Sequence, residues 1–149
     1  MDLQYPATIP ICHDDHHAKY VGWTSQGDQF FLTTPFTPAG DGEGCEFFAL
    51  YRFDSEGKFL SAEIDNLGPR ETLDGSRTKE RLQSIIDSLG EVQYGDINIQ
   101  PFQVEKDGVE FGLIPTEADF VEDEEDMCLE FQPGNFMAFY PPWDGSYDT

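Results

Sequence analysis

Apolar side chains are concentrated between Glu46 and Asp65. Two aromatic-rich runs, 47–53 and 59–64, flank the polar segment 54–58. Side chains of a strand point alternately to its two faces, and the first run is apolar on both. This pattern predicts a central hairpin whose strands are covered on both sides. Gly57, which adopts a positive φ at little cost, predicts a type I turn with a bulge between the strands.

Three further hairpins are predicted from apolar runs joined by turn residues. Their strands are 20–24 with 29–34, 96–104 with 109–114, and 128–132 with 136–140. Asp107-Gly108 predicts a type I′ turn in the second pair, and Pro133-Gly134 a type II turn in the third. Because Pro101 cannot donate to a ladder, strand 96–104 is expected to be an edge strand or bulged. Residues 1–18 are expected to be irregular.

One amphipathic helix is predicted over residues 76–89. Its apolar residues recur at helical spacing and form a single stripe that must pack on another element: Leu82, Ile85, Ile86 and Leu89. Asp74 or Ser76 can cap its start, and Gly90 fits the left-handed position after its end. The three bases in its first turns, Arg77, Lys79 and Arg81, are unfavourable for the helix dipole. We expect them to pair with acidic neighbours, and a dedicated anion site is the alternative.

These elements predict an α+β fold. The antiparallel sheet would be built from about four hairpins, with the one main amphipathic helix packed on it. The length of 149 residues is typical of a single domain, so we expect residues 1–149 to form one unit. The sequence leaves the strand order and the oligomeric state open.

The chain is strongly acidic and rich in aromatic residues. Its net charge is −22, and it contains thirteen Phe, six Tyr and two Trp. Disordered acidic chains are poor in aromatics, so a folded protein is indicated. The charge disfavours nucleic acid and anionic membranes and favours a basic protein partner or a cation. Without a signal-like start or a membrane-length apolar run, a cytoplasmic location is expected, with Cys12, Cys45 and Cys128 as free thiols.

The acids are densest in 117–126, EADFVEDEED. The run lacks the glycine and the spacing of an EF-hand loop. One interpretation is an extended, solvated segment held open by charge repulsion. The other is a docking site for a basic partner, in which the embedded apolar side chains act as anchors. The candidate partner-binding residues are Asp119, Phe120, Val121, Glu122, Asp123, Glu124, Glu125 and Asp126.

A second candidate site is the CHDDHH segment at 12–17, which contains every histidine of the chain. Imidazole, thiolate and carboxylate groups bind zinc, so His13, Asp14, His16 and His17 are candidate ligands of zinc or another divalent metal. The alternative is a loop packed under the first hairpin. No residue is identified as catalytic, because the serines lack a nucleophile elbow and no Cys–His pair can be placed beyond this segment.

The C-terminal segment NFMAFYPPWDGSYDT carries a dense aromatic group around Pro141-Pro142. Its members are Phe136, Phe139, Tyr140, Trp143 and Tyr147. Such side chains bury a large area while a polar atom stays accessible, so we expect this segment to cover the open end of the sheet. A surface that recognises peptides is the alternative.

Three patches resemble a group of uncharacterised bacterial proteins: IPICHDD, VGWTSQGDQFF and AFYPPWDGSYDT. Some members carry the label "formate hydrogenlyase regulatory protein HycA-like". The resemblance implies a cytosolic bacterial protein with a regulatory role and supplies no catalytic residue. In size, charge and expected compartment the chain is also similar to immunity proteins that neutralise toxins.

The leading hypothesis is therefore an acidic cytosolic protein-binding module, regulatory or immunity-like, that docks a basic protein partner. The alternative is a metal-dependent enzyme that uses the 12–17 His/Asp/Cys cluster. A structural or oligomerising domain is a third hypothesis. Mimicry of the charge pattern of DNA is disfavoured, because the acids are interleaved with aromatics.

Overall fold

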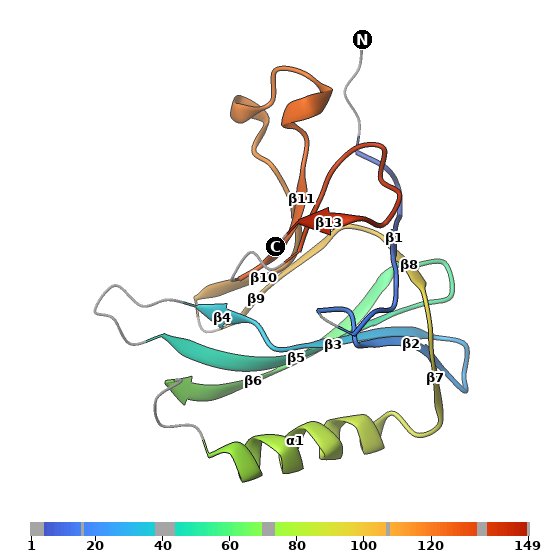
Figure 1. Ribbon diagram of the computed structural model, residues 1–149, viewed down its shortest axis with the longest axis vertical. Coiled ribbons are helices and arrows are strands. Elements are labelled where there is room, and N and C mark those ends of the chain that lie inside the picture. The colour runs from blue at the N-terminus through green and yellow to red at the C-terminus, as the bar shows by residue number, and fades with distance from the viewer. Residues whose placement is uncertain are drawn as a thin grey trace.

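The computed structural model describes residues 5–15, 17–37, 44–69, 74–106, 108–133 and 137–148. Its elements stack in three layers: one helix, a six-stranded sheet and a five-stranded sheet (Figure 1). A separate pair of short strands lies beside them. The expected α+β class is confirmed, and the described strands pair in antiparallel fashion throughout.

The six-stranded sheet is the middle layer. Its strands are β2 (Tyr20–Thr24), β3 (Gln29–Thr33), β4 (Phe36–Thr37), β5 (Cys45–Phe53), β6 (Phe59–Pro69) and β7 (Val92–Tyr94). They follow the order β4-β5-β3-β2-β7, with β6 paired to the other side of β5. The hairpin β5–β6 is the longest pairing of the fold, and β5 lies in the interior of the sheet, as its sequence pattern predicts. The expectation that both strands are covered on both sides is wrong for β6, which is an edge strand whose residues are mostly exposed or half-buried.

The five-stranded sheet forms the upper layer of Figure 1. Its strands, in the order β13-β12-β11-β10-β9, are β9 (Phe102–Lys106), β10 (Val109–Pro115), β11 (Leu129–Gln132), β12 (Ala138–Phe139) and β13 (Tyr147–Asp148). The separate pair joins β1 (Ile9–Ile11) to β8 (Ile97–Ile99). The fold thus divides the predicted hairpins between two sheets.

All four predicted hairpins form, as β2–β3, β5–β6, β9–β10 and β11–β12. Two further expectations are wrong. The segment 96–104 is not one strand, because it divides at Gln100-Pro101 into β8 and β9, which belong to different sheets. The N-terminal segment is not irregular throughout, since Ile9–Ile11 pairs with Ile97–Ile99 and buries both of its isoleucines. The type I′ and type II turns involve Asp107 and Gly134, which lie outside the described residues.

Both faces of β5 are buried, as its apolar pattern predicts. Ala49, Tyr51 and Phe53 face the core between the two sheets, where Tyr51 lies opposite Phe31 of β3. Phe48 and Leu50 face the helix layer. In the turn after β5, the Asp54 carboxylate accepts from the amides of Glu56 and Lys58, each at 2.9 Å. Gly57 has a φ of 92° there, and the pairing shifts register beside the turn, in agreement with the predicted bulge.

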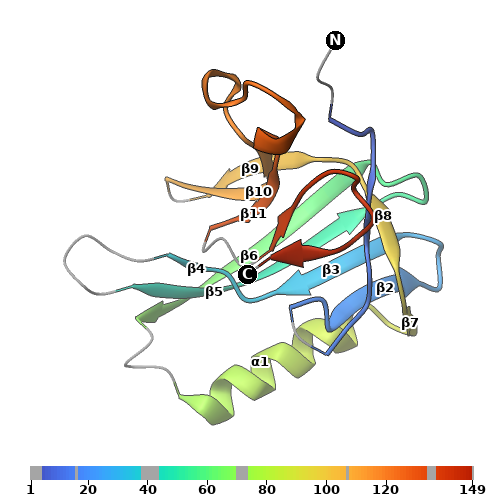
Figure 2. The same ribbon diagram turned by 45° about the horizontal axis from the view of Figure 1, so that its top comes forward.

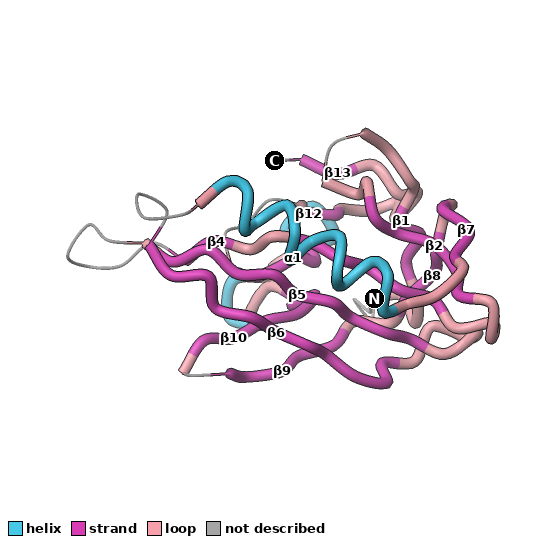
Figure 3. The backbone as a smooth tube through the Cα atoms, turned by 90° about the horizontal axis from the view of Figure 1, so that it is seen from below, coloured by secondary structure: helices cyan, strands magenta, loops and turns pink. Residues whose placement is uncertain are grey.

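The helix α1 (Gly75–Ser88) lies across the six-stranded sheet (Figure 3). Asp74 caps its start by accepting from the amides of Ser76 and Arg77, and Gly90 follows its end with a φ of 75°. Ile85 and Leu89 are buried against β3 and β5, so the predicted stripe is the face that packs. Arg81 forms the expected ion pair, with Asp65 of β6.

The C-terminal segment packs on the end of the molecule, as expected. Phe139 is fully buried, Trp143 packs on Tyr5 with ring centroids 5.9 Å apart, and Tyr147 lies 5.7 Å from Phe139. Phe136 lies outside the described residues. Among the described parts of the chain, no helix is long and apolar enough to cross a membrane.

Candidate functional site

The residues 117–126, which we call the acidic loop, connect β10 to β11. They form two short 3-10 helices, η2 (Ala118–Phe120) and η3 (Glu124–Asp126). In both Figures 1 and 2 these orange turns project from the end of the molecule that lies away from α1. The expectation of an extended segment is therefore wrong, because the loop is folded into turns.

Backbone amides hold the acidic loop in this shape despite the repulsion among its acids. One carboxylate oxygen of Asp126 accepts from the amides of Glu122 and Asp123, at 2.9 and 3.3 Å. Asp123 in turn accepts from the amide of Glu125 at 3.0 Å, and Asp123 and Asp126 form a reciprocal capping box. Hydrogen bonds from N–H groups to carboxylates are charge-assisted, and they offset part of the repulsion. Two of the acids thus order the loop and the others face solvent.

The loop exposes one large apolar side chain among its acids. Phe120 is 70 % exposed, whereas Val121 is half-buried. The exposed acids of the loop, which surround it in sequence, are Glu117, Asp119, Glu122, Asp123, Glu124, Glu125 and Asp126. An aromatic ring held in solvent by a structured loop is available for burial against a partner.

A shallow groove lies beside η3 and connects the acidic loop to the C-terminal segment. It measures about 460 Å³ and is lined by Glu124, Glu125, Tyr140, Pro141 and Pro142. We call it the proline groove. Tyr140 is 40 % exposed there, so the groove combines two carboxylates with an aromatic ring and proline surfaces. Sequence reasoning placed these two segments in separate sites and missed that the fold brings them together.

Three of the chain's bases lie on the helix, away from this end. Residues 107–149 contain no Lys or Arg, whereas Arg77, Lys79 and Arg81 belong to α1, on the opposite side of the six-stranded sheet (Figure 1). The segment that contains the acidic loop and the C-terminal residues therefore has no lysine or arginine that could neutralise its acids. This base-free stretch is the sequence signal that could have linked the acidic loop to Tyr140.

Two of the predicted metal ligands, His13 and Asp14, make hydrogen bonds to different groups of the protein. The His13 ring bonds to the carbonyl of Lys19 at 3.0 Å, and Asp14 accepts from the Tyr147 hydroxyl and from the amide of Ala18. Among the described residues, no three His, Cys, Asp or Glu side chains form a group that could hold a metal ion. His16 lies outside the described residues. The metal site with His13, Asp14, His16 and His17 therefore stays a prediction.

The three cysteines are free thiols. Burial, followed by the charges of Asp96, Asp144 and Asp14, raises the pKa of Cys12. Burial raises the pKa of Cys128 to about 11. A thiol attacks as its thiolate, so these shifts make both groups poorer nucleophiles near neutral pH.

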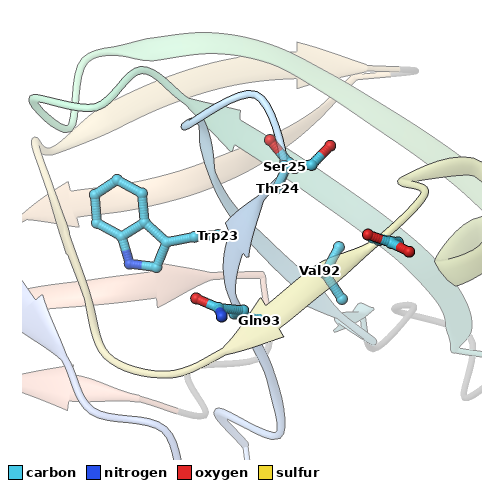
Figure 4. Close-up of a pocket in the computed structure, with 6 residues that line it drawn as sticks. Trp23, Thr24, Ser25, Val92 and Gln93 are labelled. Carbon is cyan, nitrogen blue, oxygen red and sulfur yellow. The ribbon is translucent and has the colours of Figure 1, made fainter.

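A second cleft of about 490 Å³ lies at the β2–β7 edge of the six-stranded sheet (Figure 4). It is lined by Trp23, Thr24, Ser25, Glu91, Val92 and Gln93. The Trp23 indole N–H is already bonded to the carbonyl of Asp96 at 3.1 Å. No histidine is among these lining residues, and the one titratable side chain that lines the cleft is Glu91.

Comparisons with protein families, with curated proteins and with solved structures gave no match for this chain. The resemblance to HycA-like and immunity proteins therefore stays a prediction. What the chain does has to be inferred from its own surface.

Proposed function

We propose that this protein is a binding module that docks a basic protein through the acidic loop and the proline groove. The observation that carries the proposal is Phe120, whose ring is 70 % exposed within a run of ordered acids. A loop that served only to solvate the chain would gain nothing from such a ring. Regulation of a partner enzyme or neutralisation of a toxin is the use that we propose for this contact.

Charge and apolar surface would act at different steps of binding. The net charge of −22 and the base-free end favour encounter with a cationic surface and raise association rates by roughly 10- to 10³-fold. Burial of an exposed phenylalanine contributes about 1.5–3 kcal/mol and slows dissociation. Because the loop is ordered by its capping box before binding, little conformational entropy is lost on docking.

The geometry of the groove supports a cationic side chain as the contacting group. Glu124 and Glu125 offer carboxylates, and the Tyr140 ring offers a face for a cation–π contact. The planar guanidinium of arginine can stack on a ring and pair with a carboxylate. We therefore propose that the partner protein presents arginine side chains on a basic surface.

Quantitative capture tests this function. Immobilised protein is incubated with extract of the source organism at a series of NaCl concentrations, and bound proteins are quantified by mass spectrometry. The proposal predicts a basic protein that is retained at low salt and released as salt rises. Phe120→Ala should weaken its binding at least fivefold, the lower bound for an anchor worth about 1 kcal/mol.

Matched controls separate a specific site from general charge. Leu60→Ala removes a side chain that is 52 % exposed on β6, and it should leave capture unchanged. Glu124→Gln with Glu125→Gln should weaken capture, whereas Glu56→Gln with Glu80→Gln, two exposed acids elsewhere, should not. Equal losses from both charge pairs, or capture that is insensitive to Phe120, would contradict the proposal.

A further inference from the structure

The core between the two sheets contains a buried polar group that lacks a partner. The side chain of Tyr51 is 1 % exposed, and its hydroxyl makes no hydrogen bond to any described residue. Burial raises the pKa of this phenol, so it stays protonated and can donate. An unpaired buried hydroxyl is costly, and in folded proteins such groups are nearly always satisfied by protein or by ordered water.

Tyr51 lines a small cavity between the sheets. The cavity measures about 10 Å³ and is lined by Phe31, Thr33, Pro35, Tyr51, Phe131, Gln132, Pro133 and Met137. One water requires roughly 10–15 Å³ on this measure, together with two to four polar partners. The space therefore fits a single water and excludes an organic ligand.

Two other polar residues line this largely apolar cavity. Thr33 lies two residues after Phe31 on β3, so its side chain shares the face that points into the inter-sheet core. Gln132 ends β11 on the opposite sheet and also lines the cavity. Each of the two sheets thus contributes one polar residue to the lining of the cavity beside Tyr51.

We propose that this cavity binds one water, which accepts the hydrogen bond of the Tyr51 hydroxyl and bridges it to Thr33 and to the Gln132 end of β11. The water belongs to the fold and joins the two sheets across an otherwise aromatic core. This site is independent of the docking surface, so either inference can fail without the other.

Water–protein cross-relaxation in the NMR spectrum of the wild-type protein tests the site directly. A water held in the core gives nuclear Overhauser contacts to the side-chain protons of Thr33 and Met137 with the sign of a long-lived species. Detection of these contacts supports the proposal, and their absence overturns it. This measurement requires no variant.

Two substitutions test the energetic role. Tyr51→Phe should raise the unfolding equilibrium constant about three- to tenfold, the effect of one lost hydrogen bond. If the hydroxyl has no partner, its removal leaves the constant unchanged or lowers it. Tyr94→Phe, at a ring that is 45 % exposed, is the matched control and should change it less than twofold.

A double-variant cycle shows whether Tyr51 and Thr33 share one water. Thr33→Val keeps the shape of the side chain and removes its hydroxyl. If both residues bind the same water, the combined variant should show an effect clearly smaller than the product of the two single effects. An effect equal to that product would contradict a shared water.

Discussion

Gly112 of β10 offers a sharp test of how the five-stranded sheet is built. Its φ is 144°, a conformation that favours glycine, and it lies opposite Gln103 of β9 and Gln132 of β11. A methyl group added there would stand 2.2 Å from the carbonyl oxygen of Phe102. Gly112→Ala must therefore strain the backbone and push β9 away from β10.

The expected cost follows from these two effects. A non-glycine residue in a sparsely populated backbone region costs about 1–3 kcal/mol. Loss of one or two ladder hydrogen bonds adds about 0.5–1.5 kcal/mol each. We therefore expect Gly112→Ala to lower the free energy of unfolding by about 3 kcal/mol.

Urea denaturation, followed by the fluorescence of Trp23 and Trp143, measures this change. A loss of stability lowers the urea concentration at the midpoint of unfolding, while the dependence of the unfolding free energy on urea stays constant. Gly95→Ala is the matched control, because its added methyl meets no atom within 4 Å and its φ is not positive. The control should leave stability unchanged or raise it by up to about 1 kcal/mol. A Gly112→Ala variant within about 0.5 kcal/mol of wild type would refute the described pairing of β9 with β10.

Three further predictions concern the helix cap, the aromatic core and a buried thiol. Asp74→Ala should lower the free energy of unfolding by about 1 kcal/mol in urea denaturation, because two first-turn amides lose their acceptor. Asp74→Ser should restore most of that loss, and an equal loss in both variants would contradict a capping role. Phe102→Ala should cost about 3–5 kcal/mol, since its ring packs on three aromatic rings within about 5 Å, whereas exposed Leu60→Ala should stay within about 0.5 kcal/mol. Alkylation of Cys128 at pH 8, followed by mass spectrometry, should be about a hundredfold slower in the folded than in the unfolded chain, because its pKa rises from 9.0 to about 11. The folded thiol binds its proton more tightly, so its contribution to stability is present below pH 9 and is lost between pH 9 and 11; Cys128→Ala should lack that loss.

Local signals predicted most of the elements. The stripe that contains Ile85 and Leu89 predicts both the helix and the face that packs, because the spacing of these residues along the helix itself defines that face. The β5–β6 hairpin and its turn are also predicted from local sequence, but the edge position of β6 is not, because strand order depends on pairing across the chain. Asp74 and Gly90 mark the helix ends for the same reason.

Long-range pairing was not predicted. β1 and β7 are three residues long and depend on partners far away in the chain, β8 and β2 respectively. Pro101 was correctly seen to disturb its strand, but no local rule shows that the chain changes sheets there.

The sequence likewise predicted some features of the candidate site and missed others. The acidic loop is visible as a run of charge, and Phe120 within it was singled out. Its turns were not expected, because a charge run by itself indicates repulsion, and the amides that cap Asp123 and Asp126 depend on the folded geometry. The neighbouring Tyr140 was missed although the β11–β12 hairpin was predicted, because no local signal places the residue after that hairpin beside η3.

The central claim is that the acidic end attracts and binds cationic protein surfaces at one defined place. Titration of the isotope-labelled protein with hexaarginine, followed by amide chemical shifts, tests this most directly, with hexaglutamine as the neutral control. The claim predicts saturable shifts concentrated at residues 120–126 and at Tyr140, which diminish as NaCl rises. Shifts of similar size at exposed acids elsewhere, such as Glu56 and Glu80, would contradict it.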